Sequence, residues 1–209
     1  RRALPEDHDV SHKAIGAFSA IGAVLVGLGV ILFVASNWHT MTPTIKVAIL
    51  LAGMLASAFA GYSLAFERKT YPITGLALLL INVFIYGASI FLIGQIYHLP
   101  LDWSTGMLYW FIGTAVFGYA LQSRLHIWMA VPILLLALSW FSASVRTGGS
   151  EFAALFDDSG LLVLFPIMGI GLLSLGILHR LHSWFGFAER TLMHWGLFLL
   201  ALVMVVSTV

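Results

Sequence analysis

The feature that most constrains this chain is a succession of apolar stretches long enough to cross a lipid bilayer. The hydrocarbon core of a bilayer is about 30 Å thick, which takes about 20 helical residues to cross. Seven stretches of about that length follow one another: 15–37, 43–66, 73–97, 103–122, 127–145, 161–179 and 191–209. Lipid cannot satisfy backbone polar groups, and the stretches lack the alternation of a β-barrel. The sequence therefore predicts an all-α, polytopic integral membrane protein with about seven transmembrane helices.

The composition supports this prediction and excludes other classes of protein. Hydrophobic residues make up 60% of the chain and charged residues only 9%, whereas a soluble domain carries about 25% charged residues. The net charge of +1 leaves no basic face for nucleic acid. The absence of cysteine from the sequence excludes disulfides, thiolate metal sites and cysteine nucleophiles. The predicted partner is the lipid bilayer, with other membrane subunits as a further option.

Two more predictions concern the organisation and the orientation of the chain. Residues 1–14 are polar and predict a short N-terminal stub, and residues 15–209 predict a single transmembrane domain. Of the ten Lys and Arg residues, only Lys46 and Arg146 fall on the side of the membrane opposite the N-terminus. Because positively charged loops stay in the cytoplasm, the N-terminus is predicted to be cytoplasmic and the C-terminus to lie outside.

The first and third stretches end in a similar pattern of residues. Glycine, phenylalanine and a carboxamide recur at the same spacing, as Gly29, Phe33 and Asn37 and then as Gly87, Phe91 and Gln95. Both helices would run from inside to outside, so the pattern predicts a parallel repeat in which the first two helices match the third and fourth. The alternative is a chance recurrence in a sequence rich in glycine and phenylalanine.

The outer ends of the first four predicted helices collect polar side chains, which are costly at membrane depth. The members are Asn37, Trp38, His39, Lys46, Gln95, Tyr97, His98, Asp102 and Trp103. Two carboxamides, two imidazoles, a carboxylate and an ammonium group could bind a polar head group or a small ligand. The alternative is ordinary interface chemistry, in which Asp102 caps a helix and Lys46 extends its ammonium group into water. Lys46 could also pair with Asp102 or receive an anionic ligand.

A second set of polar residues lies along the third stretch. Asn82, Tyr86, Ser89 and Tyr97 fall on one helical face, which should point into the helix bundle. They predict either a seam of interhelical hydrogen bonds or the wall of a polar pathway. Small residues such as Thr114 and Gly118 in the fourth stretch predict close helix packing.

The sequence contains only weak candidates for a metal site and no recognised catalytic motif. The histidine pairs 8/12 and 179/182 would each share a helix face, as metal ligands require, but no zinc signature accompanies them. The sequence contains no nucleophile elbow, phosphate loop or protease dyad. All nine acidic residues fall in loops or at span edges, which argues against an ion-driven pump. We therefore predict no catalytic residue, no cofactor and no metal.

The segments GVILFVASNW (29–38) and IGQIYHLPLDW (93–103) resemble the bacterial predicted membrane proteins of the domain-of-unknown-function 2157 family. In that family the first helix ends in an Asn-Trp pair, and the third runs into Gly-Gln-Ile-Tyr-His followed by Asp-Trp. The resemblance covers residues 15–122. It implies a multi-pass protein of the bacterial inner membrane and assigns no activity. It also implies that the motif residues of the outer cluster act as a unit.

Three functions compete on these observations. In the first, the protein binds or translocates a small or lipid-like ligand at the periplasmic cluster. Asn37 and Gln95 would hydrogen-bond that ligand, His98 and Asp102 would set its charge, and Trp38 and Trp103 would pack on it. In the second, the protein is a non-catalytic accessory subunit and the cluster is structural. In the third, which we favour least, it is a membrane enzyme that uses His98 and Asp102 as an acid–base pair.

Overall fold

A computed structural model of the protein describes residues 22, 25, 29, 32–69, 71–147, 158–182 and 186–207. The chain divides into two units, residues 1–46 and residues 47–209, and each is described by itself. In the first unit residues 32–37 are helical and residues 38–40 form a turn. The predicted stub, residues 1–14, lies outside the described residues. The predicted single domain and the predicted repeat each relate the two units to one another, so they stay predictions.

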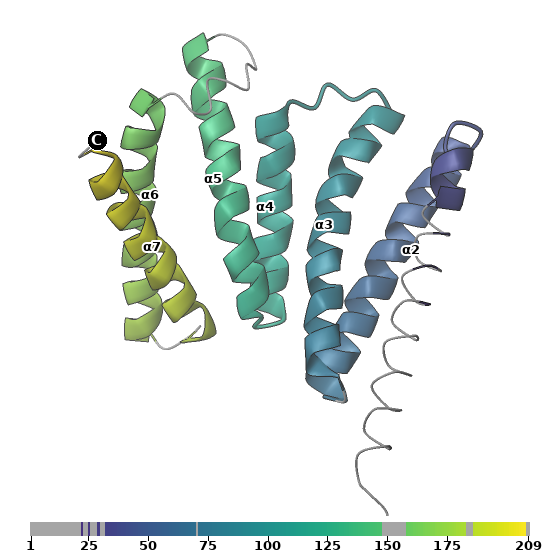
Figure 1. Ribbon diagram of the computed structural model, residues 1–209, viewed down its shortest axis with the longest axis horizontal. Coiled ribbons are helices and arrows are strands. Elements are labelled where there is room, and N and C mark those ends of the chain that lie inside the picture. Colours follow the sequence, from purple (N-terminus) through teal and green to yellow (C-terminus); the bar gives the residue numbers. More distant parts are fainter. Residues whose placement is uncertain are drawn as a thin grey trace, which may run out of the picture. The chain divides into compact units, whose positions relative to one another are not determined.

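The described part of the chain is helical and contains no strand. The elements are α2 (Pro43–Tyr62), the π-helical turn η1 (Ser63–Glu67), α3 (Pro72–Ile96), α4 (Trp103–Ala120), α5 (Arg124–Thr147), α6 (Asp158–His182) and α7 (Gly186–Val206). Successive helices from α3 onward run in opposite directions (Figure 1). The connection from α3 to α4 and the end of α7 therefore lie at one end of the second unit, and the connection from α4 to α5 lies at the other. The all-α prediction is confirmed.

Five described segments are long and apolar enough to cross a membrane. They are Pro43–Glu67, Pro72–Ile96, Arg124–Ser142, Val163–Leu181 and Gly186–Val205. They confirm the class of polytopic membrane protein. The first predicted span lies largely outside the described residues. The fourth is the helix α4, which has 18 residues but carries Gly, Ser, Thr, Tyr and Trp at many positions, so its mean hydropathy falls below that of the five.

The structure corrects several predicted helix ends. Helix α5 begins at Arg124 rather than at 127, α6 covers 158–182 rather than 161–179, and α7 begins at Gly186 rather than at 191. The apolar stretch marks the length of helix that faces lipid, whereas the helix continues through polar residues while its backbone bonds are satisfied. Helix α4 instead ends two residues early, because Gln122 turns into the left-handed region with a φ of 49°.

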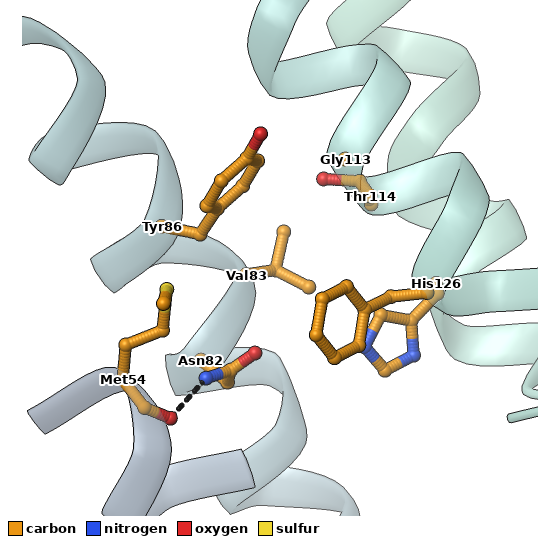
Figure 2. A pocket seen from close by; sticks show the side chains of 8 residues that line it. Met54, Asn82, Val83, Tyr86, Gly113, Thr114 and His126 are labelled. Carbon is orange, nitrogen blue, oxygen red and sulfur yellow. Dashed lines mark hydrogen bonds between the residues drawn. The ribbon is translucent and has the colours of Figure 1, made fainter. Parts of the chain in front are cut away.

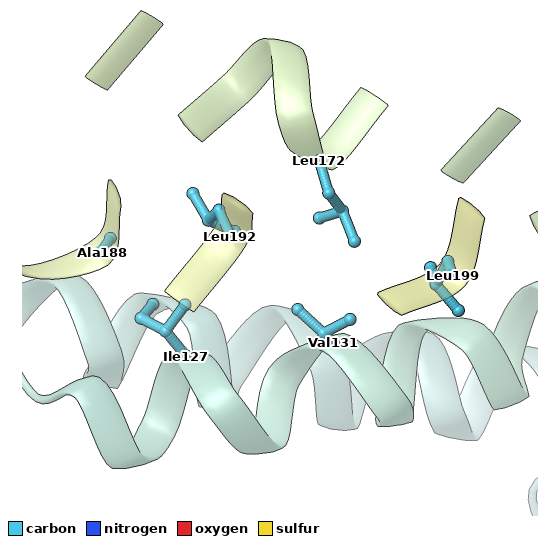
Figure 3. Close-up of a cluster of buried hydrophobic side chains, with 6 residues drawn as sticks. All are labelled: Ile127, Val131, Leu172, Ala188, Leu192 and Leu199. Carbon is cyan, nitrogen blue, oxygen red and sulfur yellow. The ribbon is translucent and has the colours of Figure 1, made fainter. Parts of the chain in front are cut away.

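The apolar core of the second unit lies where α5, α6 and α7 meet (Figure 3). Its buried members are Ile127, Val131, Leu172, Ala188, Leu192 and Leu199. They come from one face of each of three helices and contain no polar group. This core fixes α5 against the α6–α7 pair, and α5 in turn packs along α4.

Two helix crossings are made backbone to backbone at glycines. A Cβ on Gly61 of α2 would come within 3.0 Å of the carbonyl oxygen of Gly75 in α3. Gly169 of α6 and Gly196 of α7 meet similarly, since a Cβ on Gly196 would lie 2.8 Å from the Gly169 carbonyl oxygen. Small residues let membrane helices approach this closely, and they fix the distance between the two axes.

Candidate functional site

The end of α3 turns sharply at His98. The N–H of Leu99 donates to the carbonyl of Gly94 at 2.9 Å, and the N–H of His98 donates to the carbonyl of Gln95 at 3.4 Å. These two bonds define a Schellman cap, whose left-handed position is commonly glycine. Here that position is His98, with a φ of 52°. The sequence therefore places an exposed imidazole where the backbone alone would favour a residue with no side chain.

The start of α4 is capped by Asp102. Its carboxylate accepts hydrogen bonds from the N–H of Thr105 at 3.1 Å and from the hydroxyl of Ser104. These bonds, first that of Ser104 and then those of Thr105, lower the pKa of Asp102 to about 2. Asp102 is thus an N-cap, as the interface interpretation predicted, and it is ionised at neutral pH.

An open groove lies between the end of α3 and the start of α4. Its volume is about 320 Å³, and it is lined by Phe91, Gly94, Gln95, His98, Leu99, Leu101 and Trp103. The side chains of Gln95 and His98 are exposed. The apolar part of the wall comes from two rings, because Phe91 and Trp103 pack with their centroids 4.8 Å apart. The groove therefore combines a carboxamide and an imidazole with aromatic surface.

The aromatic surface continues from Trp103 to α5. The rings of Trp103 and Trp140 lie 5.6 Å apart. A second open groove of about 300 Å³, lined by Ser104, Thr105, Leu108, Ala137, Leu138 and Phe141, follows the line between α4 and α5. Trp103, the first residue of α4, is 49% exposed and lines the first groove. The second groove begins at the next residue, Ser104.

The predicted cluster members of the first unit have partners of their own. The amide nitrogen of Asn37 donates to the carbonyl of Phe33 at 2.9 Å and to the Ser36 hydroxyl at 3.2 Å. The Lys46 ammonium lies 5.2 Å from the centroid of the Trp38 ring, which is cation–π geometry. Asn37 is therefore engaged with its own helix and Lys46 with Trp38. The predicted pairs of Lys46 with Asp102 and of Asn37 with Gln95 stay predictions.

The structure brings together only part of the predicted site. Gln95, His98 and Trp103 share the first groove. Asp102 follows Leu101 of the groove wall in the chain but is engaged with its own helix, and Tyr97, the C-cap of α3, is 51% exposed. Among the described residues no group of three or more His, Asp or Glu side chains is placed to hold a metal. The histidine pair 8/12 lies outside the described residues, as does the side chain of 182.

The polar face of α3 is an interhelical seam. The Asn82 amide nitrogen donates to the Met54 carbonyl of α2 at 2.7 Å and to the Ser57 hydroxyl at 3.1 Å. The Tyr86 hydroxyl donates to the carbonyl of Tyr109 in α4 at 3.1 Å. These bonds confirm the predicted seam for two of its residues. Ser89, although buried, donates only to its own helix, at the carbonyl of Ile85.

Two buried residues near this seam were not recognised as polar site residues in the sequence. Thr114 of α4 is 2% exposed and His126 of α5 is 1% exposed. In the sequence Thr114 reads as a small packing residue, and His126 comes directly before an apolar stretch and reads as an interface residue. The sequence contains no direct signal for either residue, because His126 enters the helix only when α5 begins at Arg124, as the structure shows.

Comparison with known families places the chain. A family model described as predicted membrane protein (DUF2157) matches residues 1–127, which is more than half of the 209 residues. The chain belongs to this family. No curated protein and no solved structure matches it. The match to the DUF2157 family includes α2, α3, α4 and the first residues of α5, and therefore the groove residues from Phe91 to Trp103 and the seam.

Proposed function

We propose that this DUF2157 protein binds a small or lipid-like ligand at the groove between α3 and α4. The observation that carries the proposal is the mixed lining of that groove. Phe91 and Trp103 supply ring surface, while the exposed Gln95 and His98 supply hydrogen-bonding groups. Binding sites commonly combine an apolar wall with a few polar groups that orient the ligand. An amphipathic molecule fits such a wall better than a purely polar one.

The proposed site faces the periplasm of a bacterial inner membrane. The end of the second unit that holds the groove is opposite the α4–α5 connection (Figure 1). Arg68, Lys69 and Arg124 lie in or next to the connections at that opposite end. Positive loops stay in the cytoplasm, so the groove would open outward and the N-terminus would be cytoplasmic.

Because the protein has no cysteine, Leu99→Cys and Gln122→Cys test this orientation. An impermeant thiol reagent added outside should label Leu99→Cys alone, and the reverse result contradicts the assignment.

Ligand binding is tested on protein extracted in polymer discs with its native lipids. Native mass spectrometry should find a retained molecule, and Gln95→Ala should lower its occupancy about tenfold by removing one hydrogen-bonding group from a partly desolvated site. His98→Asn should act similarly while keeping a side chain that tolerates the left-handed turn. Gln122→Gly removes the same carboxamide at the other end of α4 and should leave the occupancy unchanged. Equal occupancy in the wild type and Gln95→Ala contradicts the proposal.

A specific observation favours the accessory-subunit alternative for two cluster members. Asn37 is satisfied by its own helix and Asp102 caps α4, which are structural roles. Under this alternative Gln95→Ala would alter neither a bound molecule nor a function, and purification would retain a partner subunit. The enzyme alternative is less favoured, because an Asp102 with a pKa of about 2 is a poor general base or acid at neutral pH.

A further inference from the structure

A small, partly open cavity lies between α2, α3, α4 and α5 of the second unit, away from the groove. Its volume is about 10 Å³. Figure 2 shows several of its lining side chains. The lining residues are Met54, Asn82, Val83, Tyr86, Gly113, Thr114, Phe117 and His126. The seam described above therefore ends at a cavity with room for about one water molecule.

Two polar atoms at this cavity are buried without a protein partner. They are the hydroxyl oxygen of Thr114 and the Nε2 atom of His126. Leaving such an atom unpaired forfeits the hydrogen bond that it makes to water in the unfolded chain, and neither lipid nor the neighbouring Phe117 ring offers a replacement. The other imidazole nitrogen, Nδ1, is already 2.9 Å from the Ser123 hydroxyl. The cavity is thus bordered by two side chains with unmet hydrogen-bonding capacity.

We propose that this cavity is a binding site for a single water molecule that hydrogen-bonds Thr114 Oγ1 and His126 Nε2. A water molecule both donates and accepts, so it satisfies Nε2 in either tautomer of the imidazole. A cation of similar size is disfavoured, because none of the lining residues is acidic. Asn82 adds a polar border, since its amide nitrogen faces Met54 and its oxygen is turned away from that contact (Figure 2).

The site would connect two helix pairs inside the membrane. On one side, Asn82 ties α3 to α2 through the Met54 carbonyl and Ser57. On the other, His126 reaches the turn between α4 and α5 through Ser123, which is 2% exposed. The bound water would complete a buried polar line between these two groups. This hydration site is independent of the ligand groove, and its failure would leave the proposed function untouched.

The sign of a stability change tests the site. Thr114→Val replaces the hydroxyl with a methyl group of the same shape. If water is bound, Thr114→Val removes one of its two partners, so the water is lost and His126 Nε2 is left unpaired, and the unfolding equilibrium constant should rise roughly tenfold. If the cavity is dry, the same change removes an unpaired hydroxyl and should stabilise the protein. Thr114→Ser keeps the hydroxyl and serves as the matched reference, and Thr74→Val makes the same change at an exposed position of α3.

A second variant tests whether the two side chains share the water. His126→Asn retains a group able to bond Ser123 but removes Nε2. Its effect combined with Thr114→Val should be clearly smaller than the sum of the single effects, because both remove the same bridge. Additive losses would overturn the shared site, as would stabilisation by Thr114→Val.

X-ray hydroxyl-radical footprinting supplies a direct readout of the bound water. Met54, which lines the cavity, should be oxidised in the wild type and protected in Thr114→Val. The exposed Met204 serves as the internal reference.

Discussion

The α6–α7 pair and the α3–α4 pair are held together in opposite ways. In α6–α7, Gly169 and Gly196 bring the two backbones into contact beside an apolar core, and Arg180 and Glu189 pair across the two helices at 3.8 Å. In α3–α4, aromatic rings occupy the space that glycine leaves. The Trp110 indole lies in the notch at Gly87, where a Cβ would overlap it, and its Nε1 donates to the Val83 carbonyl at 2.9 Å.

The aromatic arrangement alternates between the two helices. Phe91 of α3 lies against Gly106 of α4, and Tyr86 of α3 lies against Gly113. Phe91 also lines the groove beside Trp103, so a ring of this crossing forms part of the groove wall. The comparison teaches that a close apolar crossing stabilises the bundle, whereas a crossing built from rings and carbonyl hydrogen bonds leaves a surface available for binding.

The largest expected effect comes from breaking the backbone crossing. Gly196→Ala would place a Cβ against the Gly169 carbonyl oxygen and the Leu173 backbone, neither of which can move aside. We expect a loss of about 2–3 kcal/mol in the free energy of unfolding, typical of overpacking. Unfolding in mixed detergent micelles measures it. Gly171→Ala is the control in the same pair, because nothing lies within 4 Å of its Cβ, and it should be neutral or stabilising.

A smaller effect should follow from weakening the aromatic crossing. Trp110→Phe keeps a ring in the Gly87 notch but removes the indole N–H that bonds Val83. Hydrogen bonds between membrane helices contribute about 0.6 kcal/mol on average and up to about 1.7 kcal/mol, so we expect a loss of about 1 kcal/mol. Chemical unfolding followed by circular dichroism measures the change. A loss as large as that of Gly196→Ala would contradict the contrast drawn between the two pairs.

The N-cap of α4 should contribute about as much to the free energy of unfolding as the Trp110 hydrogen bond, and its contribution should depend on pH. Asp102→Ala removes the acceptor of the Thr105 N–H, and we expect a loss of about 1 kcal/mol, whereas Asp102→Asn, also a good N-cap, should cost less. Because folding lowers the pKa of Asp102 to about 2, its stabilisation is present above the unfolded value near 4 and is lost as the pH falls toward 2. Unfolding curves measured across that range should show wild type and Asp102→Ala converging, and a constant difference would contradict the assignment.

The smallest expected effect comes from the left-handed residue His98, whose replacement tests stability and ligand binding separately. His98→Gly relieves the left-handed strain and should stabilise the protein by about 0.5–1 kcal/mol. Gln122→Gly at the equivalent cap of α4 should do the same. If His98 serves a ligand, only His98→Gly should also lose the retained molecule in native mass spectrometry. Thermal unfolding of the two variants side by side tests the pair.

Much of the fold follows from the sequence because lipid imposes a simple rule. An apolar stretch of about 20 residues must be a helix where it crosses lipid, and α2 with η1 and α3 lie where their stretches predict. The helix ends are less predictable, since polar residues such as Arg124 continue a helix outside the lipid. The sequence did predict the N-cap at Asp102, because a carboxylate ahead of a helix start is a frequent N-cap.

The two candidate sites also differ in how far the sequence could predict them. Gln95, His98 and Trp103 could be grouped from the sequence because they lie within nine consecutive residues around the α3–α4 connection, so local geometry brings them together. The cavity at Thr114 and His126 depends on the packing of four helices, and no periodicity in a single stretch reports which faces meet. The seam residue Asn82 was recognised as inward-facing, but its partner Met54 contributes only a backbone carbonyl, which every residue carries.

The modest hydropathy of α4 has a consequence for how the chain is inserted into the membrane. A segment with Ser104, Thr105 and three glycines gains little from lipid during translation, and insertion depends on the summed transfer free energy of the whole segment. Helix α4 packs along α5, which follows it after only three residues and whose Arg124–Ser142 segment is long and apolar enough to cross a membrane. The two are therefore expected to leave the translocon as a hairpin, so that the helix that builds the groove enters the bilayer only with its neighbour.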